Sequence, residues 1–202
     1  MRNNTIAKSA AVLFRRMYIS SLWYLAIYAL VMTILCIVFV KTGVEQPLDL
    51  AEHIAISNRV FLLVIGIIFP LSLKNYVAVG VTRKQFALAL SAAALALSVC
   101  FTVLYAVVLL VSGTFSLSAI FTIFAFALFS FHVGWLAILG FQLKHLYTVI
   151  PGLVCAFTLN WGSGVLAQSA INDLLKPVAA VAATIILIAV IVKASRHIKI
   201  SC

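Results

Sequence analysis

Charged residues are scarce in this 202-residue chain, and acidic ones are nearly absent. Asp and Glu together number 4, and all charged residues make up 9% of the sequence. Soluble domains usually carry about 25% charged residues. With 65% hydrophobic residues, a globule of this length would also leave too much apolar surface in water. The composition therefore excludes a soluble enzyme, a disordered chain and a secreted disulfide scaffold, and it predicts an all-α integral membrane protein.

Cysteine and catalytic motifs are likewise sparse. The 4 cysteines have no close pairing of the kind that metal and redox motifs use. No predicted membrane span contains Asp or Glu, and neither HExxH nor the phosphate-binding GxxxxGK[ST] pattern occurs. The chain is therefore not expected to be an enzyme by itself or to hold a metal or a cofactor.

Six apolar runs predict six transmembrane helices, because a bilayer core of about 30 Å needs about 20 helical residues. Two residues qualify the second of these runs. Lys74 is expected to snorkel to the inner interface, and Pro70 to kink its helix. The predicted spans cover residues 18–40, 60–81, 86–111, 117–139, 146–160 and 178–192.

The segments between and beyond these spans complete the predicted transmembrane domain, residues 18–193. The polar stretch 41–59 is expected to be a solvated outer loop, and 162–175 an outer re-entrant or interfacial helix. Residues 194–202 form a predicted cytoplasmic tail.

The basic residues predict the orientation. With the N-terminus inside and six alternating spans, eleven of the 14 Lys and Arg residues fall on the inner side. Only Lys41, Arg59 and Lys176 fall outside, together with all 4 acidic residues. This obeys the positive-inside rule and places both termini in the cytoplasm. The formal charge of +10 is thus explained by topology, and nucleic acid is not an expected partner.

The first residues have an amphipathic helical pattern. Ile6, Ala10, Leu13 and Phe14 share one face, and the basic residues lie elsewhere. Residues 1–17 are therefore predicted either to lie as an interfacial helix on the inner membrane surface or to act as a simple basic anchor.

Two features inside the predicted spans favour packing over chemistry. Ala89 with Ala93, and Ala92 with Ala96, are small-xxx-small pairs that permit close helix approach. His132 is the one ionisable residue at the middle of a predicted span. A neutral imidazole bonded to a neighbouring helix is favoured over a group that lines a pathway or carries a proton.

The segment between the second and third predicted spans is longer and more apolar than a simple turn needs to be. Residues 74–86 are mostly apolar yet lie at the cytoplasmic surface, where an apolar stretch suits a partner's groove. The simpler interpretation is a helix end with basic anchors. Within the segment stands Gly80-Val81-Thr82-Arg83-Lys84-Gln85-Phe86.

This motif and its place resemble the permease subunits of type-2 ABC transporters, many of which are exporters. In that family a short cytoplasmic coupling helix precedes a Gly-x-(Ser/Thr)-Arg-(Lys/Arg)-x-Phe-like start of the third span. The overall plan also agrees with this family: it has a similar chain length, a basic amphipathic N-terminus, six predicted spans and an outer segment before the last span. The location implied is a plasma membrane, that of a bacterium.

The resemblance implies that two permease chains, identical or related, pair with two separate cytoplasmic subunits that bind ATP and Mg. The coupling residues would be Asn75, Tyr76, Gly80, Val81, Thr82, Arg83 and Lys84. A hydrophobic or amphipathic cargo, such as a peptide, a lipid-like molecule or a drug, would follow a path through the bilayer. Its candidate residues are Phe61, Phe69, Phe157, Asn160 and His132.

Two other classes share this size and plan. A substrate-capture subunit of an energy-coupling-factor vitamin importer would dock through small residues of the first span, but residues 18–40 are mostly large. A regulatory or immunity membrane protein could use the same fold without transport.

Overall fold

The computed structural model describes residues 2–42, 50–142 and 175–196, together with 150, 153–154, 156–158, 161–162, 165 and 198. Within these residues all regular structure is helical, and five helices are long and apolar enough to cross a membrane. The prediction of a helical, multi-pass membrane protein is thereby confirmed in its general form. The predicted span 146–160, and most of the segment 162–175, lie outside the described residues apart from a few positions.

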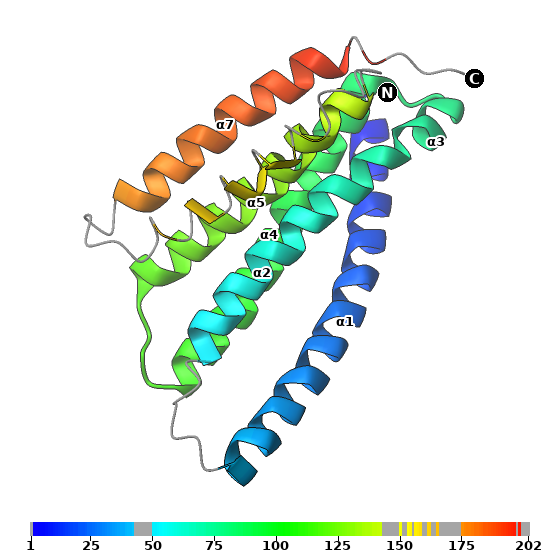
Figure 1. The fold of residues 1–202 in the computed structure, drawn as a ribbon. Coiled ribbons are helices and arrows are strands. Elements are labelled where there is room, and N and C mark those ends of the chain that lie inside the picture. Colours follow the sequence, from blue (N-terminus) through cyan, green and yellow to red (C-terminus); the bar gives the residue numbers. More distant parts are fainter. Residues whose placement is uncertain are drawn as a thin grey trace.

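Helix α5 occupies the centre of the bundle. It packs against α2, α4 and α7, while α1 packs mainly against α4 (Figure 1). The elements are α1 (Arg2–Thr42), α2 (Leu50–Ile68), the 3-10 helix η1 (Phe69–Ser72), α3 (Leu73–Ala78), α4 (Arg83–Val111), α5 (Leu117–Gln142) and α7 (Leu175–Ser195).

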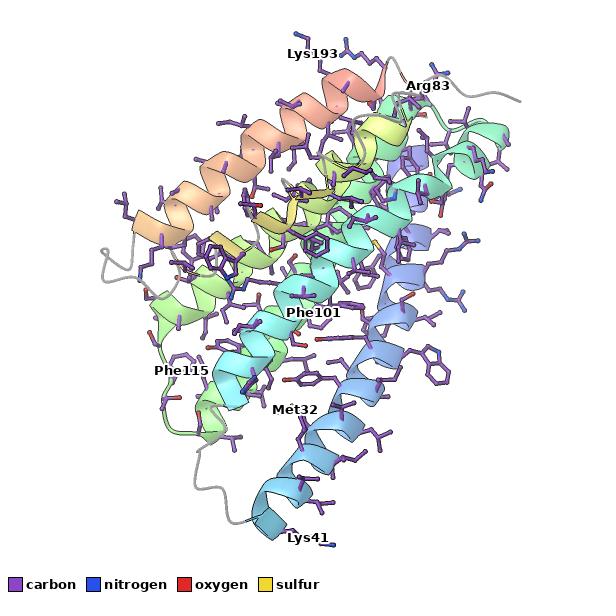
Figure 2. All side chains as sticks on the ribbon, viewed as in Figure 1. Met32, Lys41, Arg83, Phe101, Phe115 and Lys193 are labelled. Carbon is purple, nitrogen blue, oxygen red and sulfur yellow. The ribbon has the colours of Figure 1, made fainter. Side chains whose placement is uncertain are left out.

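The two ends of the bundle differ in charge. The start of α1, helix α3 and the end of α7 gather at one end, which we call the inner end after the predicted orientation (Figure 1). Arg83 and Lys193 lie at this end and Lys41 at the opposite, outer end (Figure 2). The direction of each described long helix therefore agrees with the alternation that the basic residues predict.

Helix α1 is one uninterrupted helix of 41 residues. At 1.5 Å per residue it is about 62 Å long, roughly twice the hydrocarbon thickness of a bilayer. Residues 2–17 continue into the first span without a break, and no Gly or Pro interrupts the chain before Thr42. Their apolar face lies on protein, where Leu13 and Met17 are fully buried.

Helix α2 begins earlier than predicted. It starts at Leu50, and the membrane-length segment runs from His53 to Ala78 rather than over 60–81. The expectation of a solvated loop up to Arg59 is therefore wrong for residues 50–59. Pro70 lies in η1, where the α-helix tightens into a 3-10 turn. This is consistent with proline, which lacks the backbone N–H that an α-helical hydrogen bond needs.

The remaining long helices lie close to their predicted bounds. The predicted turn at Ser112-Gly113-Thr114 separates α4 from α5, and Gly113 adopts a φ of +71° there. The main core joins side chains from α1, α2, α4 and α5, and its largest fully buried members are Trp135, Phe86, Phe101 and Phe131.

Candidate functional site

The α3–α4 turn, residues 74–86, forms a tightly specified structure at the inner end. Gly80 follows α3 with a φ of +88°, a left-handed conformation that glycine adopts without steric penalty. The N–H of Gly80 donates to the carbonyl oxygen of Val77 at 3.0 Å, and that of Val81 donates to Tyr76 at 3.0 Å. This pair of bonds is a Schellman motif, which ends α3 and satisfies its last carbonyl groups.

A capping box starts α4 two residues later. The N–H of Gln85 donates to Oγ1 of Thr82 at 3.2 Å, and the N–H of Thr82 donates to Oε1 of Gln85 at 3.0 Å. Both bonds satisfy donors that the first turn of a helix leaves unpaired. Gly80, Thr82 and Gln85 therefore have a local structural role, whatever the turn binds.

Buried aromatic rings anchor the turn to the bundle. Tyr76, Val81 and Phe86 belong to the main core cluster, as do Leu13 and Met17 of α1. The ring of Phe86 lies 5.2 Å from that of Tyr76 and 6.4 Å from that of Trp135 in α5. The turn is thus fixed to neighbouring helices.

The other side of the turn is open to solvent and combines apolar and basic groups. Lys74, Asn75 and Lys84 are exposed, and Val79 between them is 76% exposed. Arg83 is half-buried, and its Nε lacks a hydrogen-bond partner among the described residues. An exposed apolar side chain beside cations is a combination suited to binding.

Further positive charge lies at this end of the bundle (Figure 2). Lys193 and Arg196 at the end of α7 are both exposed. The acidic residues of the sequence are Glu45, Asp49, Glu52 and Asp173, none of which belongs to a described element of the inner end. A partner that binds here is expected to carry negative charge.

The candidate path residues do not form one cluster. Phe61 is half-buried between α1 and α4, with its ring 4.0 Å from that of Tyr24 and 5.7 Å from that of Phe101. Phe69 is half-buried against the main core. Phe157 is 54% exposed, and Asn160 lies outside the described residues.

His132 is fully enclosed between α5 and α4. Its Nδ1 lies 2.9 Å from the carbonyl oxygen of Leu128, and its Nε2 lies 3.2 Å from Oγ of Ser91. A carbonyl oxygen can only accept, so Nδ1 carries a proton and, in a neutral ring, Nε2 accepts from the Ser91 hydroxyl. These contacts agree with the predicted packing role.

Two helix contacts escaped the sequence analysis. Gly66 and Gly134 bring α2 and α5 into backbone contact. The hydroxyls of Tyr24 and Ser57 form a hydrogen bond that ties α1 to the outer half of α2. The sequence did contain a sign of the contact between α1 and the outer half of α2. Ile54, Asn58 and Leu62 recur at four-residue intervals, so a helical face continues into the segment that was predicted to be a loop.

Comparison of the chain with family models, with curated proteins and with solved structures found no match in any of the three.

Proposed function

We propose that this chain is the membrane-spanning subunit of an ATP-driven transporter of the type-2 ABC class. In this proposal the exposed side of the α3–α4 turn docks on a separate ATP-binding subunit. Two such subunits serve a pair of membrane chains, identical or related. ATP and Mg belong to the partner, and the direction proposed is export.

The observation that carries the proposal is the two-sided construction of the turn. Its exposed side presents Val79 between Lys74 and Lys84, so an apolar contact is flanked by cations. Such a surface fits a groove with an apolar floor and acidic rim. A turn that only reversed the chain would not need a 76% exposed valine beside a Schellman motif and a capping box.

The buried side explains how docking can drive movement. Tyr76 leads back through η1 to α2, and Phe86 is in the first turns of α4. Because their rings pack 5.2 Å apart, a displacement of the turn is passed to both helices together. ATP-driven closure of the partner then shifts the balance between inward-open and outward-open arrangements by its different affinity for the two.

The proposed cargo is hydrophobic or amphipathic. Phe61, Phe69 and Phe157 offer aromatic surface and no fixed charge. In the single chain Phe61 is already packed against Tyr24 and Phe101, so a path along α2 requires these rings to separate. Phe157 is the most open of the three.

A vitamin-capture subunit is the competing class, and α1 argues against it. That class docks through small residues on the first span, whereas the exposed face of α1 carries Ile27, Leu30 and Ile34. Large side chains prevent the close backbone approach that such docking uses.

Co-purification of the tagged full-length chain from its native membranes tests the proposal. We expect an ATP-binding subunit in equal number to the chain, with ATPase activity that rises on addition of an apolar cargo. The double variant Val79→Glu, Lys84→Glu should lose the subunit, because it places negative charge on the docking surface. Its matched control is Lys41→Glu, an exposed lysine at the outer end.

Equal recovery of the ATP-binding subunit with all three chains would remove the docking assignment. A purified chain that carries a vitamin and a large membrane scaffold, without direct contact to an ATPase, would favour the capture subunit. A chain with neither partner would favour a regulatory or immunity protein.

A further inference from the structure

The outward face of α1 carries basic residues up to Arg16 and apolar residues from there to Trp23. Lys8, Val12, Arg15, Ile19 and Trp23 follow one another at intervals of three or four residues, which places them on one side of the helix. All five are exposed, and Trp23 is 70% exposed. Side chains stand away from the bundle along this side of α1 (Figure 2).

The opposite face determines this orientation. Leu13 and Met17 are fully buried, and Ile6, Ala10 and Phe14 pack against the same core. The amphipathic pattern that would suit a surface helix is therefore satisfied by protein. Since α1 cannot rotate without exposing this face, Arg15 and Arg16 stay directed outward.

These cations have no acidic neighbours in the described structure. The acidic residues of the sequence are Glu45, Asp49, Glu52 and Asp173. Of these, only Glu52 falls in a described helix, and it lies at the start of α2, at the outer end (Figure 1). The described residues of the inner end thus offer no carboxylate to Lys8, Arg15 or Arg16. Three exposed cations on one helix end remain available to an external anion.

We propose that Lys8, Arg15 and Arg16 form a binding site for the phosphate headgroup of an anionic phospholipid. The acyl chains of this lipid lie along Ile19 and Trp23. The proposal is independent of the transport function, because it involves neither the α3–α4 turn nor an ATP-binding partner.

The apolar continuation of the face identifies a lipid rather than a soluble anion. Trp23 follows Arg15 by eight residues, or about 12 Å along the helix. That distance spans the headgroup layer of about 5–7 Å and reaches the upper acyl chains. Arginine at the phosphate level and tryptophan below it match the usual interfacial positions of these side chains, and juxtamembrane cations favour anionic lipids.

Quenching of Trp23 by brominated lipid tests this site. The full chain with Trp161→Phe is reconstituted in vesicles of phosphatidylglycerol and phosphatidylcholine, with bromine on one lipid or on the other. Trp161 is 74% exposed and would otherwise be quenched, whereas Trp135 is 1% exposed and contributes a constant signal. Because both vesicles carry the same charge, only the local lipid differs. We expect about a fivefold preference for brominated phosphatidylglycerol next to Trp23.

Three variants on the same background separate charge from structure. Arg15→Gln with Arg16→Gln should abolish the preference, Arg15→Lys with Arg16→Lys should largely keep it, and Lys41→Gln should leave it unchanged. Circular dichroism and the quenching-resistant Trp135 signal verify that each chain is folded. Equal quenching by both lipids, or a preference that survives the glutamine changes, overturns the proposal. Displacement by inorganic phosphate at matched ionic strength also overturns it, since the site would then bind a soluble anion.

Discussion

Gly66 of α2 and Gly134 of α5 meet where these two helices touch. A Cβ on Gly66 would lie 2.0 Å from the carbonyl oxygen of Phe131, and a Cβ on Gly134 would lie 2.2 Å from that of Leu63. Both neighbours are backbone atoms, which yield only if the helices move apart. The two glycines therefore set the distance between α2 and the central helix of the bundle.

Gly134→Ala is expected to destabilise the bundle by about 2 kcal/mol, because overpacking a close contact forces backbone shifts. The free energy of unfolding of the detergent-solubilised chain measures the effect. Gly162→Ala is the matched control, since an added Cβ there meets no atom of the described residues within 4 Å. Equal stability of the two variants would show that α2 and α5 separate without penalty.

The Tyr24–Ser57 hydrogen bond offers a second comparison. Tyr24→Phe should lower the free energy of unfolding by about 0.6 kcal/mol, a typical value for such a bond between membrane helices. Tyr28→Phe on the same helix should cost nothing, because the buried Tyr28 hydroxyl has no hydrogen-bond partner among the described residues. The double variant Tyr24→Phe, Ser57→Ala should be no worse than the less stable single variant. A larger loss from Tyr28→Phe than from Tyr24→Phe contradicts this assignment.

In the proposed transporter, His132→Phe is expected to leave transport of the cargo nearly unchanged. The ring of Phe131 lies 5.2 Å from that of His132, so an aromatic replacement finds aromatic surroundings. In unfolding measurements, a double-mutant cycle with Ser91→Ala should give a coupling energy of about 0.6 kcal/mol. Abolished transport in a correctly folded His132→Phe chain would instead assign His132 to the pathway.

The α3–α4 turn can be tested apart from docking. Gly80→Ala should cost about 1–2 kcal/mol, because its φ of +88° is unfavourable for a residue with a Cβ. Gly80→Asn should cost less, since asparagine tolerates this region. Thr82→Ala should cost about 1 kcal/mol and Thr82→Ser very little, because serine keeps the capping oxygen. The unfolding free energies of the four variants provide the comparison, and equal values for alanine and asparagine at position 80 contradict it.

Most of the described helices could be predicted from local sequence patterns. Long apolar runs located α4, α5 and α7, and Ser112-Gly113 marked a turn. The start of α2 was missed because Ser57, Asn58 and Arg59 look solvated until a partner helix is present. For the candidate site, the sequence pointed to residues 74–86 but could not separate their structural from their binding roles. Gly80 and Thr82 shape the turn, whereas Val79 is the residue that the turn leaves open.

The scarcity of charge indicated a multi-pass membrane protein. The placement of its few cations predicts which end of each described long helix faces inward. Both follow from transfer free energies that act on each residue where it stands. Tertiary structure alone decided which face of α1 is covered and how closely α2 approaches α5. It also decided that Tyr24 pairs with Ser57. Those outcomes depend on contacts between distant segments, since an apolar face can be buried equally well by lipid or by protein, and only packing chooses between them.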